Sequence, residues 1–298
     1  MIPASERMIR SGPLEIWTEA FGRPEDPMIL LIVGAINQGI FWPDGFCAAI
    51  AREGYRTIRY DHRDTGQSST VDWKRNPYDL RDLARDAVAI LDAYDAPTAH
   101  VVGMSMGGLV AQILALDWPA RVRTLTLLMS TPDERPYLAT ARGQDTGGFE
   151  LPPPCPRLAA HMRSTRLNPP RTEEEHVENA VEGWRICNGD VAPFDAEAMR
   201  RLQSRIWRRA RNPAAALRHF AAVAATPPRA DRLERIAAPT LVIHGGQDPC
   251  LPVEHGAALA GRIPSAQLVI VPEMGHMPAP SLLDRLAAMI VRHVRRHS

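Results

Sequence analysis

Lysine is almost absent from this sequence. Among its 35 lysine and arginine residues, Lys74 is the only lysine. A Schiff-base mechanism needs a lysine amine as its nucleophile. That amine would have to come from Lys74, which lies in the polar loop 72–76. We therefore expect no lysine-based covalent catalysis.

Long apolar runs are also missing. No stretch approaches the roughly 18 apolar residues that a membrane helix needs. The stretch 1–7 lacks a basic leader followed by an apolar core, so we expect no secretory signal and a cytoplasmic location. The net charge is only +1 for 298 residues, so we expect neither a nucleic acid nor a membrane surface as a partner.

Metal and nucleotide motifs are missing as well. The four cysteines have no C-x-x-C spacing, and we expect them to be buried free thiols. Two aspartates and a histidine lie within 61–64, but this segment is typical of a turn after a strand, and no known metal-binding spacing surrounds it. No G-x-G-x-x-G or Walker pattern occurs. The sequence therefore implies no metal and no cofactor.

What the sequence does contain is a serine in the pentapeptide G-M-S-M-G at 103–107. The run 99–102 before it is short and apolar, which is typical of a buried strand, and the apolar run 109–116 suits a helix. Strand, tight turn and helix are the context in which G-x-S-x-G exposes a nucleophile. We predict Ser105 as that nucleophile; the alternative is a glycine-rich turn that happens to contain serine.

A serine hydroxyl needs a base to take its proton, and the base needs an acid to orient it. After G-x-S-x-G, the acid precedes the histidine in the chain. The β-rich run 240–245 leads to Asp248, and the apolar run 268–271 leads to His276. Both residues then follow the carboxyl ends of strands, where open α/β sheets build their sites. We predict Asp248 as the acid and His276 as the base.

Other residues compete for these two roles. Asp231 is an alternative acid, but a surface helix position suits it better, and Glu273 is expected to face solvent. His244 falls at the end of a predicted strand, where a buried, hydrogen-bonded histidine is the simpler interpretation. His255 lies at a predicted helix start.

Acyl transfer also requires two backbone N–H groups that bind the developing oxyanion. One belongs to the residue after the nucleophile, Met106, and the other to the turn after an early strand. The apolar run 28–33 is that strand. Its turn makes Ala35 the predicted second donor, with Ile36 as the alternative if the register differs by one residue.

The whole chain resembles α/β-hydrolase-fold enzymes, and more narrowly the aclacinomycin methylesterase type. The resemblance implies a mostly parallel sheet flanked by helices, with an inserted helical cap, and an esterase activity. Those relatives cleave a methyl ester on a bulky polycyclic substrate. Besides the segments above, the resemblance is carried by Phe41–Asp44, Arg59–Gly66, Trp184–Cys187, Val191–Asp195, Gly245–Pro249 and Gly275–His276.

The change in sequence character after the run 125–129 predicts the domain organisation. We expect residues 1–131 and 231–298 to form the α/β-hydrolase core and residues 132–230 to form the helical cap. The latter segment begins proline-rich and then shows helical patterns, such as the capping box of Thr172 and Glu175.

Three aromatic residues of the predicted cap are candidate substrate-binding residues: Trp184, Trp207 and Phe220. Ordinary packing within the cap is the alternative for each. The same region carries an arginine cluster over 200–211, which we interpret as a solvated helix face.

These features together predict a cofactor-free serine esterase that forms an acyl-enzyme on Ser105. Its partner would be a small-molecule ester. A lactonase of the same fold remains an alternative, because a lactone is a tethered ester. A ligand receptor with little turnover is the alternative from a different class. The sequence leaves the natural substrate open, as it does the choice between a monomer and a homodimer.

Overall fold

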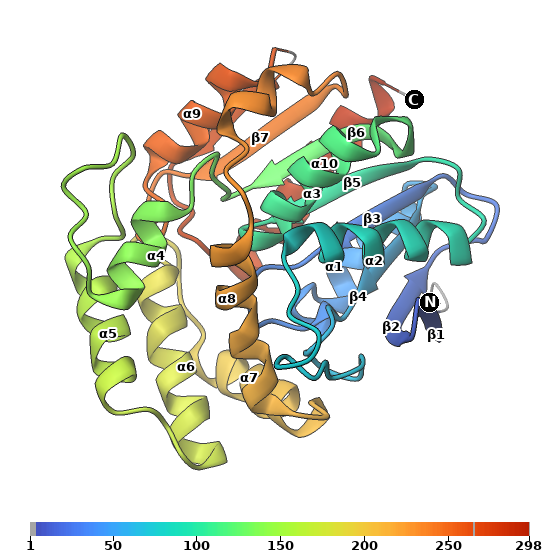
Figure 1. Ribbon diagram of the computed structural model, residues 1–298. Coiled ribbons are helices and arrows are strands. Elements are labelled where there is room, and N and C mark those ends of the chain that lie inside the picture. The colour runs from blue at the N-terminus through green and yellow to red at the C-terminus, as the bar shows by residue number, and fades with distance from the viewer. Residues whose placement is uncertain (1–3, 265, 298) are drawn as a thin grey trace.

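The computed structural model describes residues 4–264 and 266–297. The first three residues of the stretch 1–7 therefore lie outside the described part, and from Ala4 the chain forms the first strand. The described chain contains one eight-stranded sheet with the order β1-β2-β4-β3-β5-β6-β7-β8 (Figure 1). The strands are β1 Ala4–Ser11, β2 Leu14–Phe21, β3 Met28–Ile32, β4 Arg56–Tyr60, β5 Ala99–Met104, β6 Val122–Leu128, β7 Thr240–Gly245 and β8 Ala266–Val271.

Strand direction confirms the predicted mostly parallel sheet. Strand β2 is antiparallel to both of its neighbours, β1 and β4. All other neighbouring pairs are parallel, from β4 through to β8. Parallel strands are buried on both faces by helices, which explains why the central strands read as continuous apolar runs.

Helices cover both faces of the sheet, and each face has its own apolar core. In β3, Leu30 and Ile32 pack into the core on one face, while Ile29 and Leu31 pack into the core on the other. This alternation follows from the two-residue repeat of a strand. The first face is covered by α2 Leu80–Ala93, α3 Met106–Asp117 and α9 Val253–Arg262, and the second by α1 Asp44–Arg52 and α10 Leu283–Arg295.

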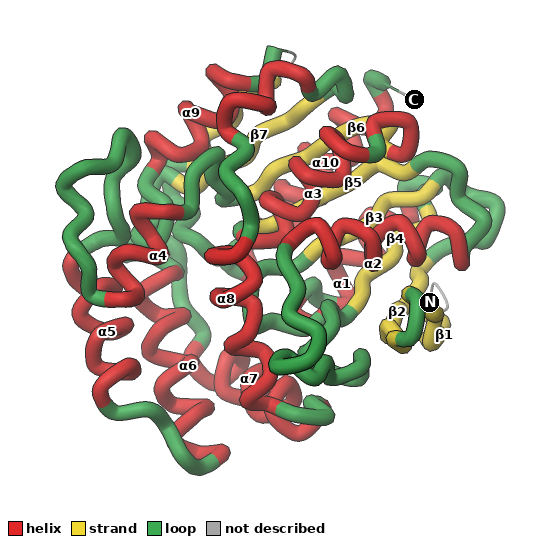
Figure 2. The backbone as a smooth tube through the Cα atoms, viewed as in Figure 1, coloured by secondary structure: helices red, strands yellow, loops and turns green. Residues whose placement is uncertain are grey.

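The chain between β6 and β7 forms a separate group of helices. They are α4 Arg135–Arg142, α5 Pro156–Leu167, α6 Glu173–Cys187, α7 Ala196–Arg209 and α8 Arg218–Ala225. Figure 2 shows them set beside the sheet, with several loops between them and the strands. They occupy the segment 132–230, and the division into core and cap remains our proposal. Of the helices described, none is long and apolar enough to cross a bilayer.

Candidate active site

Ser105 sits on a sharp turn between β5 and α3. Its backbone adopts φ 54° and ψ −121°, a left-handed conformation that is uncommon for residues other than glycine. The flanking glycines make this turn possible. A Cβ on Gly103 would overlap the carbonyl oxygen of Gly107, and a Cβ on Gly107 would overlap that of Ile32. The turn exposes the Ser105 hydroxyl ahead of the first turn of α3.

His276 lies between Ser105 and Asp248. Its Nε2 is 3.0 Å from Ser105 Oγ, and its Nδ1 is 2.8 Å from Asp248 Oδ2. Because a carboxylate only accepts hydrogen bonds, Nδ1 carries the proton and Nε2 is left to accept one. The other oxygen of Asp248 accepts the N–H groups of Cys250 and Leu251, at 2.9 and 2.8 Å. Asp248 and His276 are buried, and Ser105 is half-buried.

The loop that carries His276 is held by the end of α6. The His276 N–H donates to the carbonyl oxygen of Cys187, with 2.6 Å between N and O. A Cβ on Gly275 would overlap that same oxygen and the carbonyl oxygen of Asn188, so glycine is needed there. The segment between β6 and β7 thus contacts the histidine loop directly.

The alternative acids and bases have other partners. His244 is fully buried next to Asp248: its Nε2 is 2.7 Å from the Leu251 carbonyl oxygen and 3.5 Å from Asp248 Oδ2. Burial lowers its pKa. His255 bonds the Thr131 hydroxyl at 2.7 Å. Glu273 pairs with Arg285 at 2.6 Å.

Asp231, the other alternative acid, is exposed in the 3₁₀ helix Ala230–Arg235. The cysteines are all free, as expected, but only two of them, Cys47 and Cys250, are buried. Burial raises the pKa of Cys47 to about 12 and that of Cys250 well above its usual value. Both therefore stay as thiols, which are poor nucleophiles.

The turn after β3 lies against Ser105. A Cβ built on Gly34 would be 3.3 Å from Ser105 Cβ, so this turn passes directly beside the serine. The N–H of Ile36, the alternative to Ala35, already donates to His219 Nδ1 at 3.1 Å. Met106 begins α3, and the N–H groups of the first helical turn have no partner within the helix. The Asn37 side chain bonds the Ala35 carbonyl at 3.0 Å, a turn-forming role.

The three aromatic candidates lie in different surroundings. Trp184, on α6, packs on Phe41 with ring centroids 4.8 Å apart, and Phe41 ends the short helix that follows the turn after β3. Phe220, next to His219 on α8, stacks on Tyr137 at 6.2 Å. Trp207 packs on His176 at 4.7 Å, a contact between α7 and α6.

One arginine of the 200–211 cluster is not solvated, contrary to our expectation. Arg209 is largely buried, and its Nη1 lies 2.5 Å from the fully buried carboxylate of Asp61, just after β4. The same nitrogen donates to Gln38 Oε1 at 2.9 Å. Burial raises the pKa of Asp61 above its usual value, and the attraction of Arg209 opposes that rise. No local sequence signal separates Arg209 from its exposed neighbours.

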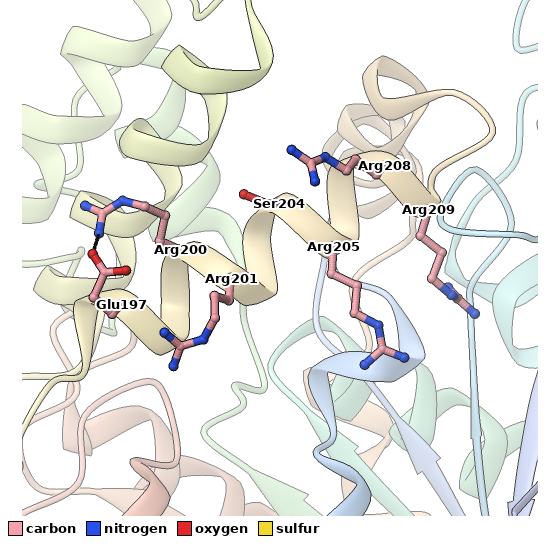
Figure 3. Close-up of a pocket in the computed structure, with 7 residues that line it drawn as sticks. All are labelled: Glu197, Arg200, Arg201, Ser204, Arg205, Arg208 and Arg209. Atoms are coloured by element: carbon pink, nitrogen blue, oxygen red, sulfur yellow. Dashed lines mark hydrogen bonds and ion pairs between the residues drawn. The ribbon is translucent and has the colours of Figure 1, made fainter.

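Most arginines of the cluster line a shallow groove along α7. Figure 3 shows that Arg208 points to the opposite side of α7 from Arg201 and Arg205, so the guanidinium groups do not converge on one ligand. Arg200 pairs with Glu178 at 2.5 Å. This shallow groove along α7 is lined by Glu197, Arg200, Arg201, Ser204, Arg205, Arg208 and Arg209.

Comparison with known proteins places the chain in a family. The model of the α/β-hydrolase fold family matches residues 27–280. Rhodomycin D methylesterase DnrP of Streptomyces peucetius is 37% identical over 292 residues, covering 97% of this chain and 98% of the relative. Rhodomycin D methylesterase DauP of Streptomyces sp. (strain C5) is 38% identical over the same shares.

A solved structure agrees with this placement. The crystal structure of a hydrolase from Pseudomonas aeruginosa PA01 superposes with a TM-score of 0.74 at 26% identity and covers 98% of both chains. The predicted fold class and the resemblance to methylesterases of this fold are confirmed. The chain belongs to the α/β-hydrolase fold family.

Proposed function

We propose that this protein is a serine esterase in which Ser105, His276 and Asp248 form the catalytic triad. The observation that carries the proposal is the position of His276, whose two ring nitrogens lie within hydrogen-bond distance of Ser105 Oγ and Asp248 Oδ2. The relationship to two methylesterases over nearly the whole chain supports a carboxylic ester hydrolase.

In the first half of the reaction, Ser105 Oγ attacks the ester carbonyl carbon, and His276 Nε2 takes the hydroxyl proton. Asp248 keeps the imidazole oriented and stabilises its positive charge. The N–H groups of Ala35 and Met106 bind the oxyanion of the tetrahedral intermediate. The C–O bond to the alcohol then breaks, and His276 returns its proton to the leaving oxygen.

In the second half, water attacks the acyl carbon of the ester to Ser105. His276 accepts a proton from that water, and a second tetrahedral intermediate forms in the same oxyanion hole. The C–Oγ bond breaks, Ser105 regains its proton from His276, and the carboxylic acid leaves. The products are one alcohol and one acid, and the chemistry needs no group beyond the protein and water.

For the substrate, we propose a methyl ester of a bulky apolar acid. The first support is the similarity to the two methylesterases named above. The second is the presence of aromatic side chains near the site: Trp184 lies on α6, which contacts the loop of His276, and Phe220 lies on α8, which contacts the turn after β3. We further propose that residues 132–230 form a cap over the serine and that this cap shapes the acyl pocket.

The test combines turnover with active-site labelling. We would measure hydrolysis before and after treatment with an organophosphonate. The substrates are p-nitrophenyl esters from acetate to decanoate and methyl esters of polycyclic aromatic acids. We expect loss of turnover as the label appears on the peptide containing Ser105. Ser105→Ala should lower kcat by about 10³-fold or more. The matched control is Ser164→Ala, an exposed serine of α5, which should retain wild-type rates.

Three outcomes would change this proposal. Undiminished hydrolysis by Ser105→Ala would refute the assignment of the nucleophile. Stoichiometric labelling of Ser105 with turnover confined to lactones would replace the esterase with a lactonase, and a stable adduct without turnover would favour a ligand receptor.

A further inference from the structure

His219 makes two hydrogen bonds that tie α8 to the core. Its side chain is fully buried. Its Nδ1 accepts the Ile36 N–H at 3.1 Å, and its Nε2 lies 3.0 Å from the Arg63 carbonyl oxygen. Because a backbone N–H only donates and a carbonyl only accepts, these two partners assign the tautomer: Nε2 carries the proton and Nδ1 is bare.

Ile36 needs such a partner. Its φ is 61°, a left-handed value that is unusual for a β-branched side chain. Its side chain is 39% exposed, so burial of the side chain does little to hold this conformation. The hydrogen bond from its N–H to His219 holds the backbone of Ile36 in this conformation.

That bond also fixes the neighbouring backbone. The peptide unit between Ala35 and Ile36 is held at both ends, because the Ala35 carbonyl accepts the Asn37 side-chain amide at 3.0 Å while the Ile36 N–H donates to His219. With this peptide plane fixed, the rotation of Ala35 about its Cα–C bond is fixed as well. The turn 34–36 then has little freedom beside Ser105.

We propose that His219 is a positioning residue of the oxyanion hole, which holds the turn 34–36 so that the Ala35 N–H stays aimed at the reacting oxygen. This inference rests on the proposed function. His219 does not touch the substrate in this view; it acts through the backbone of Ile36. Preorganised donors stabilise the transition state because they need not reorient during the reaction.

The surroundings of His219 keep it a neutral acceptor that is fixed on the core. Burial lowers its pKa, and the hydrogen bond to the Arg63 carbonyl and the negative charge of Asp64 only partly oppose that effect. The ring of His62 meets the His219 ring edge-on, with centroids 5.4 Å apart. The preceding residue, Arg218, pairs with Asp64 at 2.9 Å, so the start of α8 is anchored beside the turn.

Two substitutions separate the roles of the two ring nitrogens. In His219→Asn, the side-chain amide oxygen takes the place of Nδ1 and still accepts the Ile36 N–H. In His219→Gln, the longer side chain reaches the Arg63 carbonyl in place of Nε2, but leaves nothing at the Nδ1 position. We expect kcat for p-nitrophenyl ester hydrolysis to fall at least tenfold in His219→Gln, while KM stays within about twofold of wild type. The reason is that an oxyanion donor stabilises the transition state more than the bound substrate. His219→Asn should keep kcat within about threefold of wild type.

Amide hydrogen exchange of the peptide containing Ile36 supplies a readout that does not depend on turnover. We expect protection in wild type and His219→Asn, and loss of protection in His219→Gln. Equal losses of kcat in both variants, or a loss confined to KM, would overturn the positioning role and leave His219 a packing residue. If wild type neither turns over nor labels at Ser105, the proposed function fails and the catalytic part of this inference fails with it. Unchanged exchange in His219→Gln overturns the inference even when Ser105 labels normally.

Discussion

The guanidinium of Arg209, at the end of α7, pairs with the fully buried carboxylate of Asp61 at 2.5 Å. The same guanidinium stacks over the ring of Trp17, with its carbon 3.9 Å from the ring centroid. Asp61 accepts the N–H of Gly39, which follows the turn after β3. One ion pair thus links the segment between β6 and β7 to the core, close to the turn that lies beside Ser105.

Removal of Arg209 should therefore destabilise the protein strongly. Arg209→Met leaves the Asp61 carboxylate buried without its cation, and we expect the free energy of unfolding to fall by about 3–5 kcal/mol. Urea titration measures this. Arg205→Met is the matched control on the same helix, because Arg205 is exposed and has no ion pair among the residues that the structure describes. Its effect should stay within about 0.5 kcal/mol. Equal effects of the two substitutions would show that the ion pair contributes nothing specific.

Asp248→Asn should abolish most turnover without loss of the fold. An amide in place of the carboxylate no longer stabilises the imidazolium and favours the wrong tautomer of His276. We expect kcat to fall by about 10⁴-fold. The exposed Asp231→Asn serves as the control and should match wild type. A normal rate for Asp248→Asn would assign the acid elsewhere.

The glycines differ sharply in their tolerance of a methyl group. A Cβ on Gly107 would overlap the Ile32 carbonyl oxygen, which is backbone and cannot rotate away. Gly107→Ala should cost at least about 1–3 kcal/mol and most of the activity. Gly45, in α1, has nothing within 4 Å of such a Cβ. Gly45→Ala should raise the free energy of unfolding by about 0.4–1 kcal/mol with normal activity. Thermal melts and ester hydrolysis test both, and a tolerated Gly107→Ala would contradict the tight elbow described above.

Buried histidines should make the fold sensitive to acid. Burial lowers the pKa of His62 from 6.5 to about 3 and that of His100 to about 4. Between pH 6.5 and about 4, these histidines bind protons in the unfolded chain but stay neutral in the native state. The contribution of these histidines to the free energy of unfolding is therefore complete above pH 6.5. It is lost as the pH falls, by about 1.4 kcal/mol per pH unit for each such histidine.

The slope of the free energy of unfolding against pH, from urea titrations between pH 4.5 and 6, tests this. His62→Gln should reduce the slope by about 1.4 kcal/mol per pH unit, the contribution of one proton. A slope in His62→Gln equal to that of wild type would mean that His62 is protonated in the native state.

Much of the candidate site could be predicted from local patterns. Ser105, Asp248 and His276 each follow a short apolar strand, and the carboxyl ends of β5, β7 and β8 lie at one edge of the sheet. The need for glycine on both sides of Ser105 could also be predicted, because a strained turn that packs against other backbone leaves no room for a Cβ. The mostly parallel sheet followed from the resemblance to α/β-hydrolase-fold enzymes, and the continuous apolar runs of the central strands agree with it.

What could not be predicted depends on contacts between distant segments. His219 bonds Ile36 across 183 residues, and Arg209 bonds Asp61 across 148. Nothing in the sequence around Arg209 distinguishes it from Arg205, because helical periodicity places both on the polar side of α7. Only the folded arrangement brings one of them against a buried carboxylate. The carbonyl of Cys187 that receives the His276 N–H is likewise a backbone group without a sequence signature.

Strands β6 and β7 are immediate neighbours in the sheet, although residues 129–239 separate them. They pair in parallel from Leu125 opposite Thr240 to Leu128 opposite Ile243. The long segment therefore leaves the sheet and returns to it at adjacent points, and its length does not set the pairing register. Insertions or deletions in the loops of this segment leave that register unchanged, provided that Cys187, Arg209 and His219 keep their contacts with the core. We therefore expect changes of length to be tolerated in the loops of this segment and not at the three residues that contact the core.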